Sequence, residues 1–177
     1  MNSLPLLLTL WQSGIVSDAE VQAWLNDELA RSGTPSEVLL DLVCHGPATC
    51  LRWAEHVFPV RPIALGYLDE FAVRSLTLDL NSEADVGSFV SWAIGRCAHE
   101  DRQDSFVAYA YELLAMCMEA CDVRPGVEHV QANLASFRPQ LLARARALTD
   151  AVPGLAPSRL LEELAGGEPD ARIAGTP

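Results

Sequence analysis

The stretch that decides the fold runs from Asp104 to Cys121 and reads DSFVAYAYELLAMCMEAC. Three polar residues interrupt it at seven-residue spacing, namely Ser105, Glu112 and Glu119. On a helix they share one narrow line, and the rest of the circumference is apolar, so the helix must either be surrounded by other helices or cross a membrane. Carboxylates at several depths oppose insertion, at about 2.5–3.5 kcal/mol each near the bilayer centre. The sequence therefore predicts a central apolar helix, about residues 103–121, in an all-α fold.

Helical periodicity recurs along the whole chain, and no segment alternates with the period of two that marks a strand. Capping boxes are expected at Ser17–Glu20 and at Thr34–Glu37. The predicted helices span residues 3–12, 17–31, 35–44, 47–58, 62–80, 82–97, 103–121, 127–137 and 139–152. We predict a single compact multi-helix domain of eight or nine helices over residues 1–152. Residues 153–177 are expected to form a linker, with room for a short docking helix over 158–164, and a disordered tail.

The central helix is expected to supply the most buried positions of this domain, at Phe106, Ala110, Leu113, Leu114 and Cys117. Five cysteines occur in the chain, at positions 44, 50, 97, 117 and 121. Their number is odd and most of them fall in apolar helical stretches, which is typical of buried free thiols in a reducing compartment. We predict that Cys97, Cys117 and Cys121 are structural, reduced and slow to react.

The composition excludes several classes of function. All twelve basic residues are arginine, so neither Schiff-base chemistry nor the lysine of a phosphate-binding loop is possible. The net charge is −12, and residues 1–123 carry 18 acids against 6 arginines, whereas residues 124–177 carry 6 of each. Such a chain repels nucleic acid and anionic lipid and attracts basic proteins. The leucine-rich start lacks the basic region of a signal peptide, so a cytoplasmic location is expected.

Chemistry that uses cysteine and histidine is the main alternative to a binding function. The di-iron bundle motif requires glutamate three residues before histidine, and none of the four histidines has it. Cys117 and Cys121 share a helix face and, with Cys44, His45 and Cys50, could bind a soft metal, but no Cys-x-x-Cys pair is present. No phosphate-binding loop or nucleophile elbow occurs either. We therefore expect no catalytic residues, no metal and no cofactor.

Two features point to a protein partner instead. The helices predicted at 17–31 and 35–44 are rigidly capped, and we expect them to present one acidic surface to a basic protein, without nucleic acid or membrane involvement. Its candidate residues are Asp18, Glu20, Asp27, Glu28, Glu37 and Asp41. Trp92 lies off the apolar stripe of its helix among small residues, so it either packs against another helix or serves as a partner-binding anchor.

The first quarter of the chain also carries a family resemblance. Residues 10–21, LWQSGIVSDAEV, followed by residues 34–42, TPSEVLLDL, resemble the opening of small all-helical bacterial proteins that act as immunity partners of secreted or contact-delivered toxins. The resemblance covers about residues 10–45. It implies a cytosolic inhibitor that binds one cognate toxin through an acidic face, with no catalysis and no cofactor.

Three hypotheses follow from these observations. The first is an acidic, non-catalytic protein-binding protein of the immunity type. The second is a helical scaffold or accessory subunit of a larger bacterial, secretion-type assembly, docking through Trp92 and the short helix at 158–164. The third is an enzyme or metal protein whose site assembles only in three dimensions. A neighbouring gene for a basic toxin would favour the first, a secretion-apparatus neighbourhood the second, and bound metal in the purified protein the third.

Overall fold

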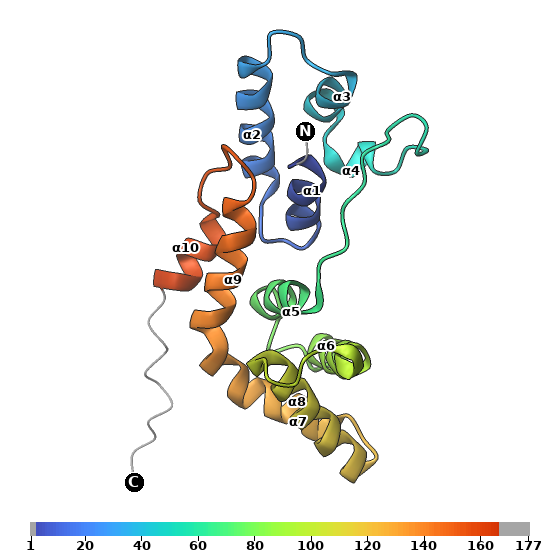
Figure 1. Cartoon of the computed structure of the whole chain (residues 1–177), viewed down its shortest axis with the longest axis vertical. Coiled ribbons are helices and arrows are strands. Elements are labelled where there is room, and N and C mark those ends of the chain that lie inside the picture. The colour runs from blue at the N-terminus through green and yellow to red at the C-terminus, as the bar shows by residue number, and fades with distance from the viewer. Residues whose placement is uncertain (1–2, 167–177) are drawn as a thin grey trace. The chain divides into compact units, whose positions relative to one another are not determined.

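The computed structural model of the chain describes residues 3–166, and within this range the fold is all-α, as predicted (Figure 1). Its elements are, in chain order, α1 (Leu4–Gln12), α2 (Asp18–Arg31), α3 (Glu37–His45), α4 (Pro47–Cys50), α5 (Tyr67–Leu76), α6 (Glu83–Arg96), the 3-10 helix η1 (Cys97–His99), α7 (Ser105–Ala120), α8 (Arg124–Asn133), the 3-10 helix η2 (Leu134–Phe137), α9 (Arg138–Asp150) and α10 (Arg159–Gly166).

Contacts within the chain group it into two compact units. Of the described residues, the first unit contains 3–64 and 146–166 and the second contains 65–145, so the boundary between them falls within α9. The single domain expected over residues 1–152 stays a prediction. The tail expected beyond Gly166 lies outside the described residues.

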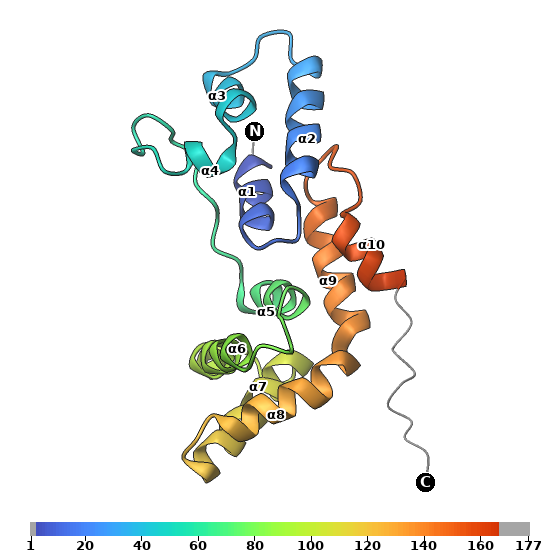
Figure 2. The same cartoon turned by 180° about the vertical axis from the view of Figure 1, so that it is seen from behind.

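The first unit begins with α1, whose leucines are among the most buried side chains of the chain. It packs on α2, which in turn packs on α3 (Figure 2). The capping box at the start of α2 is present: the Ser17 hydroxyl accepts from the Glu20 N–H, and the Glu20 carboxylate accepts from the Ser17 N–H at 2.7 Å. The second predicted box is wrong. Helix α3 begins at Glu37 and is capped by the hydroxyl of Ser36, which accepts from the Leu39 N–H, because the chain turns helical two residues after Pro35.

The segment after Pro153 is an integral part of the first unit and not a free linker. The Ser158 hydroxyl is buried and donates to the carbonyl of Ile15 at 2.5 Å, and the Arg159 N–H donates to the Glu20 carboxylate at 2.7 Å. Leu161 on α10 is only 2% exposed. The predicted short helix is therefore present as α10, and it docks on its own chain.

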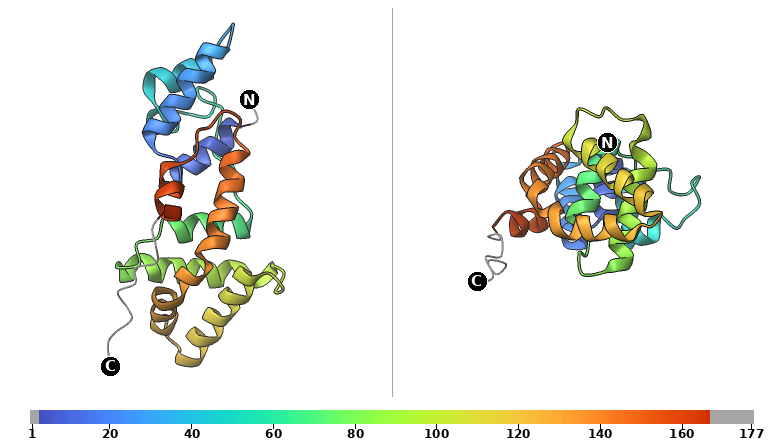
Figure 3. Two further views of the ribbon diagram at one scale, coloured as in Figure 1. Left: turned by 90° about the vertical axis from the view of Figure 1, so that its left-hand side faces the viewer. Right: turned by 90° about the horizontal axis from the view of Figure 1, so that it is seen from below.

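The second unit contains α5, α6, α7 and α8, whose ribbons Figure 3 shows. Its core combines aromatic side chains of α5, α6 and α7 with valines of α8. Phe71 of α5 lies at its centre, stacked on Phe106 of α7 with ring centroids 5.1 Å apart and edge-on to Phe89 of α6 at 5.3 Å. Gly126 lets α8 approach this core closely, because a Cβ there would lie 2.8 Å from the Cys117 sulfur. The helices α6, α7 and α8 pack against one another, as their apolar stripes predict.

Two predicted helices are shorter than expected. The helix predicted over 47–58 ends at Cys50, and the helix predicted over 62–80 is limited to α5, Tyr67–Leu76. Between them the chain follows turns and extended backbone, and Arg61 holds it by donating to the carbonyls of Trp53, Phe58 and Val60. Proline at positions 59 and 62 disfavours helical backbone before each ring, which explains why the helices do not extend into this segment.

The central helix is buried over only its first half. On α7 Phe106, Ala110 and Leu113 are buried as predicted, but Leu114 and Cys117 are only half-buried. Met118, one turn further, is 69% exposed. The expectation that this helix is surrounded along its whole length is therefore wrong, because α6 and α8 cover one side of it and nothing within residues 3–166 covers the other side of its last two turns. None of the helices in the described range is long and apolar enough to span a membrane.

The thiols divide by burial, which corrects the expectation that Cys97, Cys117 and Cys121 all react slowly. Cys50 and Cys97 are buried, Cys117 is half-buried, and Cys44 and Cys121 are exposed. Burial also raises the pKa of the Cys50 and Cys97 thiols, so less reactive thiolate forms at neutral pH. We expect iodoacetamide to modify Cys44 and Cys121 at least tenfold faster than Cys50 and Cys97, as measured by mass spectrometry of the native protein. Equal rates at all five positions would contradict the burial described above.

Candidate functional site

The six carboxylates predicted to bind a partner all belong to the first unit, but they do not form one surface. Asp18 and Asp27 are nine residues apart on α2, about two and a half helical turns, so they face opposite sides of the helix. Asp18 accepts a hydrogen bond from the indole N–H of Trp11 at 2.6 Å. Glu20 is occupied by Ser17 and Arg159. Both carboxylates at the start of α2 therefore serve the structure of the unit.

The other four carboxylates lie where α2 ends and α3 begins. Glu28 forms an ion pair with Arg31 at 3.1 Å, whereas Asp27, Glu37 and Asp41 have no ion-pair partner within residues 3–166. Glu37 and Asp41 are one turn apart on the same side of α3 and repel each other. These four residues, which we call the acidic corner, are Asp27, Glu28, Glu37 and Asp41.

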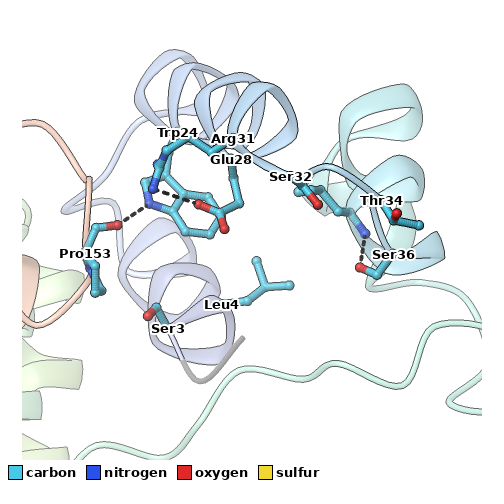
Figure 4. Close-up of a pocket in the computed structure, with 10 residues that line it drawn as sticks. Ser3, Leu4, Trp24, Glu28, Arg31, Ser32, Thr34, Ser36 and Pro153 are labelled. Carbon is cyan, nitrogen blue, oxygen red and sulfur yellow. Dashed lines mark hydrogen bonds and ion pairs between the residues drawn. The ribbon is translucent and has the colours of Figure 1, made fainter.

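A pocket of about 320 Å³ opens between α1, α2, α3 and the turn at Pro153, beside the acidic corner (Figure 4). Its apolar lining comes from Leu4, Trp24 and Leu39. Its polar lining comes from the Glu28–Arg31 pair and from the hydroxyls of Ser3, Ser32, Thr34 and Ser36. Six of the ten lining residues are polar or charged, so the pocket offers hydrogen-bonding groups as well as an apolar surface to one side chain or a small ligand.

The walls of this pocket are held in place by contacts within the first unit. The Trp24 indole N–H donates to the Pro153 carbonyl at 2.9 Å, which fixes the ring against the turn (Figure 4). Arg31 donates to the Asp27 carbonyl at 3.2 Å. Its guanidinium also packs on Gly154, where φ is +77° and a Cβ would lie 2.8 Å from the Arg31 Nη2. These contacts hold Trp24 and Arg31 in place at the wall of the pocket.

Glu20 gives the first unit a pH-dependent contribution to stability. Partial burial tends to raise the pKa of this carboxyl, but the hydrogen bonds from Ser17 and Arg159 outweigh burial and lower it below its ordinary value of 4.5. A depressed folded-state pKa means that the stabilisation is fully present above the unfolded-state pKa and is lost as the pH falls through the folded-state pKa.

We therefore expect Glu20→Gln to destabilise the protein at pH 7, with the difference from wild type shrinking as the pH falls below 4.5. The measurement is urea unfolding at a series of pH values. Glu128→Gln, at an exposed carboxylate with no hydrogen-bond partner among the described residues, is the matched control and should show no such trend. A destabilisation by Glu20→Gln that stays constant down to about pH 3 would contradict the assignment.

Trp92 lies in the second unit, packed into the aromatic core. Its ring stacks on Tyr67 with centroids 5.5 Å apart and planes 14° from parallel, and the Arg74 guanidinium covers it at 4.6 Å. The sequence allowed Trp92 either to pack against another helix or to anchor a partner. These contacts agree with packing. The side chain is half-buried, so one edge stays accessible.

The residues considered for catalysis or metal binding are dispersed. Within residues 3–166 no three side chains of His, Cys, Asp or Glu lie close enough together to hold a metal ion. One group has a catalytic composition: His129 lies 3.6 Å from Glu112 and next to the buried Tyr109 ring. Burial raises the pKa of Tyr109, so its hydroxyl stays protonated at neutral pH and cannot act as a base there.

The chain was compared with known proteins by family, sequence and structure. It matches no protein-family model, no curated protein and no solved structure. The candidate site therefore depends on the geometry of its own residues. Sequence reasoning found the acids of this site but not its pocket, because Trp24 and Pro153 are 129 residues apart and no local pattern connects them.

Proposed function

We propose that this protein is a non-catalytic, cytoplasmic binding protein of the bacterial immunity type, and that the acidic corner and its pocket bind a basic segment of one partner protein. The observation that carries the proposal is a partly apolar pocket whose own carboxylate, Glu28, is paired with Arg31, while the adjoining Asp27, Glu37 and Asp41 have no ion-pair partner within residues 3–166. A side chain in the pocket would supply affinity, while neighbouring arginines or lysines of the partner would neutralise Asp27, Glu37 and Asp41.

The pocket and the carboxylates are expected to affect different steps of binding, as in other protein interfaces. Apolar or aromatic anchors buried in a pocket contribute most of the binding free energy and mainly set the dissociation rate. Exposed charges act mainly on the association rate, and their influence falls off over about 8 Å at physiological salt. Charge and pocket variants are therefore expected to change different rate constants.

The competing proposal, a scaffold or accessory subunit of a secretion-type assembly, assigned docking roles to Trp92 and to the helix at 158–164. In the structure Trp92 stacks on Tyr67, and Leu161 of α10 is buried against its own chain. Both proposed docking elements therefore make contacts within this chain, which favours the immunity-type proposal over the scaffold proposal.

The charge prediction concerns Glu37→Lys together with Asp41→Lys. We expect this variant to fold normally, because both side chains face solvent at least in part. It should associate severalfold more slowly with a basic partner protein once one is identified by its binding to the wild type. The control is Glu55→Lys with Glu128→Lys, the same charge change at exposed acids outside the acidic corner. Association rates are measured by stopped flow at low and at high salt. The wild type should associate faster than the charge-reversed variant at low salt, and the two rates should converge at high salt. Equal slowing by both variants would contradict a local role.

The pocket is tested separately by Thr34→Trp, which replaces a lining residue with a bulky indole. The matched control is Ala23→Trp at an exposed position of α2 that does not line the pocket. We expect Thr34→Trp to speed dissociation at least tenfold and Ala23→Trp to leave it unchanged. If neither variant changes dissociation while the charge reversal slows association, the partner uses the acidic corner without the pocket, and this part of the proposal is wrong.

A further inference from the structure

A second surface, in the second unit, has a different character. After Leu113 no residue of α7 is fully buried, although six of the last seven residues of the helix are apolar. Three of these residues, half-buried Leu114 and exposed Ala115 and Met118, lie within about 100° of one another around the helix, and exposed Cys121 follows them as the C-cap. We call them the α7 stripe: Leu114, Ala115, Met118 and Cys121. Single exposed apolar residues are ordinary, but a continuous row over two turns marks an interaction surface.

The shape and chemistry of the α7 stripe fit a helix. Its helical members Leu114, Ala115 and Met118 are related by spacings of three and four residues, which is the pattern that an apolar face of another helix matches. Met118 has a flexible, polarisable side chain that adapts to different partners. The stripe is therefore suited to side-by-side helix packing.

The charges beside the stripe select the kind of helix. Glu112 and Glu119 run along one side of it and Asp122 follows at its end. Glu112 lies 3.6 Å from His129, and Arg124 is the neighbouring cation in sequence. At its other end, the guanidinium of Arg102, from the segment before α7, lies 3.9 Å from the centre of the Tyr111 ring, so the acidic character is confined to the C-terminal end of the stripe. A cationic partner complements the carboxylates beside the stripe. A second copy of this chain in a symmetric pair would instead place these carboxylates against one another. Anionic lipid is repelled for the same reason.

We propose that the α7 stripe binds a basic amphipathic helix of a partner protein. This surface shares no residue with the acidic corner, so the proposal is independent of the function proposed above. The partner that fits the α7 stripe is a helix with one apolar face and with lysine or arginine on both sides of that face.

The test uses three fluorescently labelled peptides of 18 residues and the full chain. The first places leucine on one helical face and lysine elsewhere, the second has the same composition in scrambled order, and the third replaces lysine with glutamate. By fluorescence anisotropy we expect the first peptide to bind at least tenfold more tightly than the other two. Hydrogen exchange should show new protection within residues 111–122. Equal binding of the scrambled peptide would overturn the proposal, because net charge alone would then explain it.

Variants locate the binding site. Ala115→Gln with Met118→Gln keeps helix-forming residues at exposed positions, and it should weaken the first peptide at least tenfold. Ala132→Gln with Ala143→Gln, also at exposed helical positions, should not. Circular dichroism checks that both variants fold. Unchanged binding by the α7 variant would overturn the proposal, and so would a wild-type dimer in sedimentation that this variant dissociates, because a second copy would then cover the stripe.

Discussion

Replacing Phe71 with alanine is expected to lower the free energy of unfolding by about 3–5 kcal/mol. Phe71 is fully buried, and its ring lies within 5.1–6.4 Å, centroid to centroid, of five other aromatic rings. These rings come from α5, α6 and α7, so the truncation would leave a cavity that no single helix can fill by moving. The neighbouring rings are Tyr67, Phe89, Trp92, Phe106 and Tyr109.

The control for this prediction is Phe137→Ala, the same chemical change at the edge of the same cluster. Phe137 is half-buried and contacts Phe106 and Tyr109, so its truncation leaves a site that water can enter. We expect the midpoint of urea unfolding, followed by circular dichroism, to fall much further for Phe71→Ala, with the slope of the transition unchanged. If both substitutions cost the same, Phe71 is not the centre of this core.

Much of the fold could be predicted because local patterns agree with the final packing. Helix α6 has its apolar residues at helical spacing, a capping serine at Ser82 and a single buried side, and all three features point to the same element. The same agreement holds for α2, where the Ser17–Glu20 capping box marks the first turn. Such elements are predictable since each is specified within about fifteen residues of sequence.

Where prediction failed, the decisive interaction was either not periodic or not local. The apolar residues between Leu51 and Phe58 resemble a helix, but they form turns that Arg61 holds through backbone carbonyls. A side chain that donates to carbonyls several residues away leaves no hydrophobic pattern. The sequence predicted a short docking helix from Ser158 but not its docking place, since the bond from Ser158 to Ile15 spans 143 residues.

The candidate site was predictable in its residue types but not in its grouping. The sequence identified six carboxylates near two capped helices, yet Asp18 and Glu20 turned out to hold the start of α2 and α10 in place. A carboxylate in the first turn of a helix is often used for capping, which is the signal that could have separated these two from the rest. The pocket has no signal within a single segment, because Leu4, Trp24 and Pro153 meet only in the folded unit.

The neighbouring residues Leu113 and Leu114 provide the sharpest test of how α7 is covered. The apolar sequence of the helix predicts both in the core, but Leu113 is 0% exposed whereas Leu114 is only half-buried. Leu113→Ala is therefore expected to cost about 2–5 kcal/mol of unfolding free energy as a core cavity. Leu114→Ala should cost about 1 kcal/mol, because only part of its side chain leaves water on folding.

This pair is its own control, since both substitutions remove the same atoms from the same helix and change its intrinsic propensity equally. The difference between them, measured by urea unfolding at low protein concentration, reports burial alone. Repeating the measurement at a tenfold higher concentration should leave both values unchanged if the exposed side of α7 is free in solution. A cost for Leu114→Ala equal to that of Leu113→Ala would mean instead that this side is covered, and the exposed α7 stripe would not exist in the isolated protein.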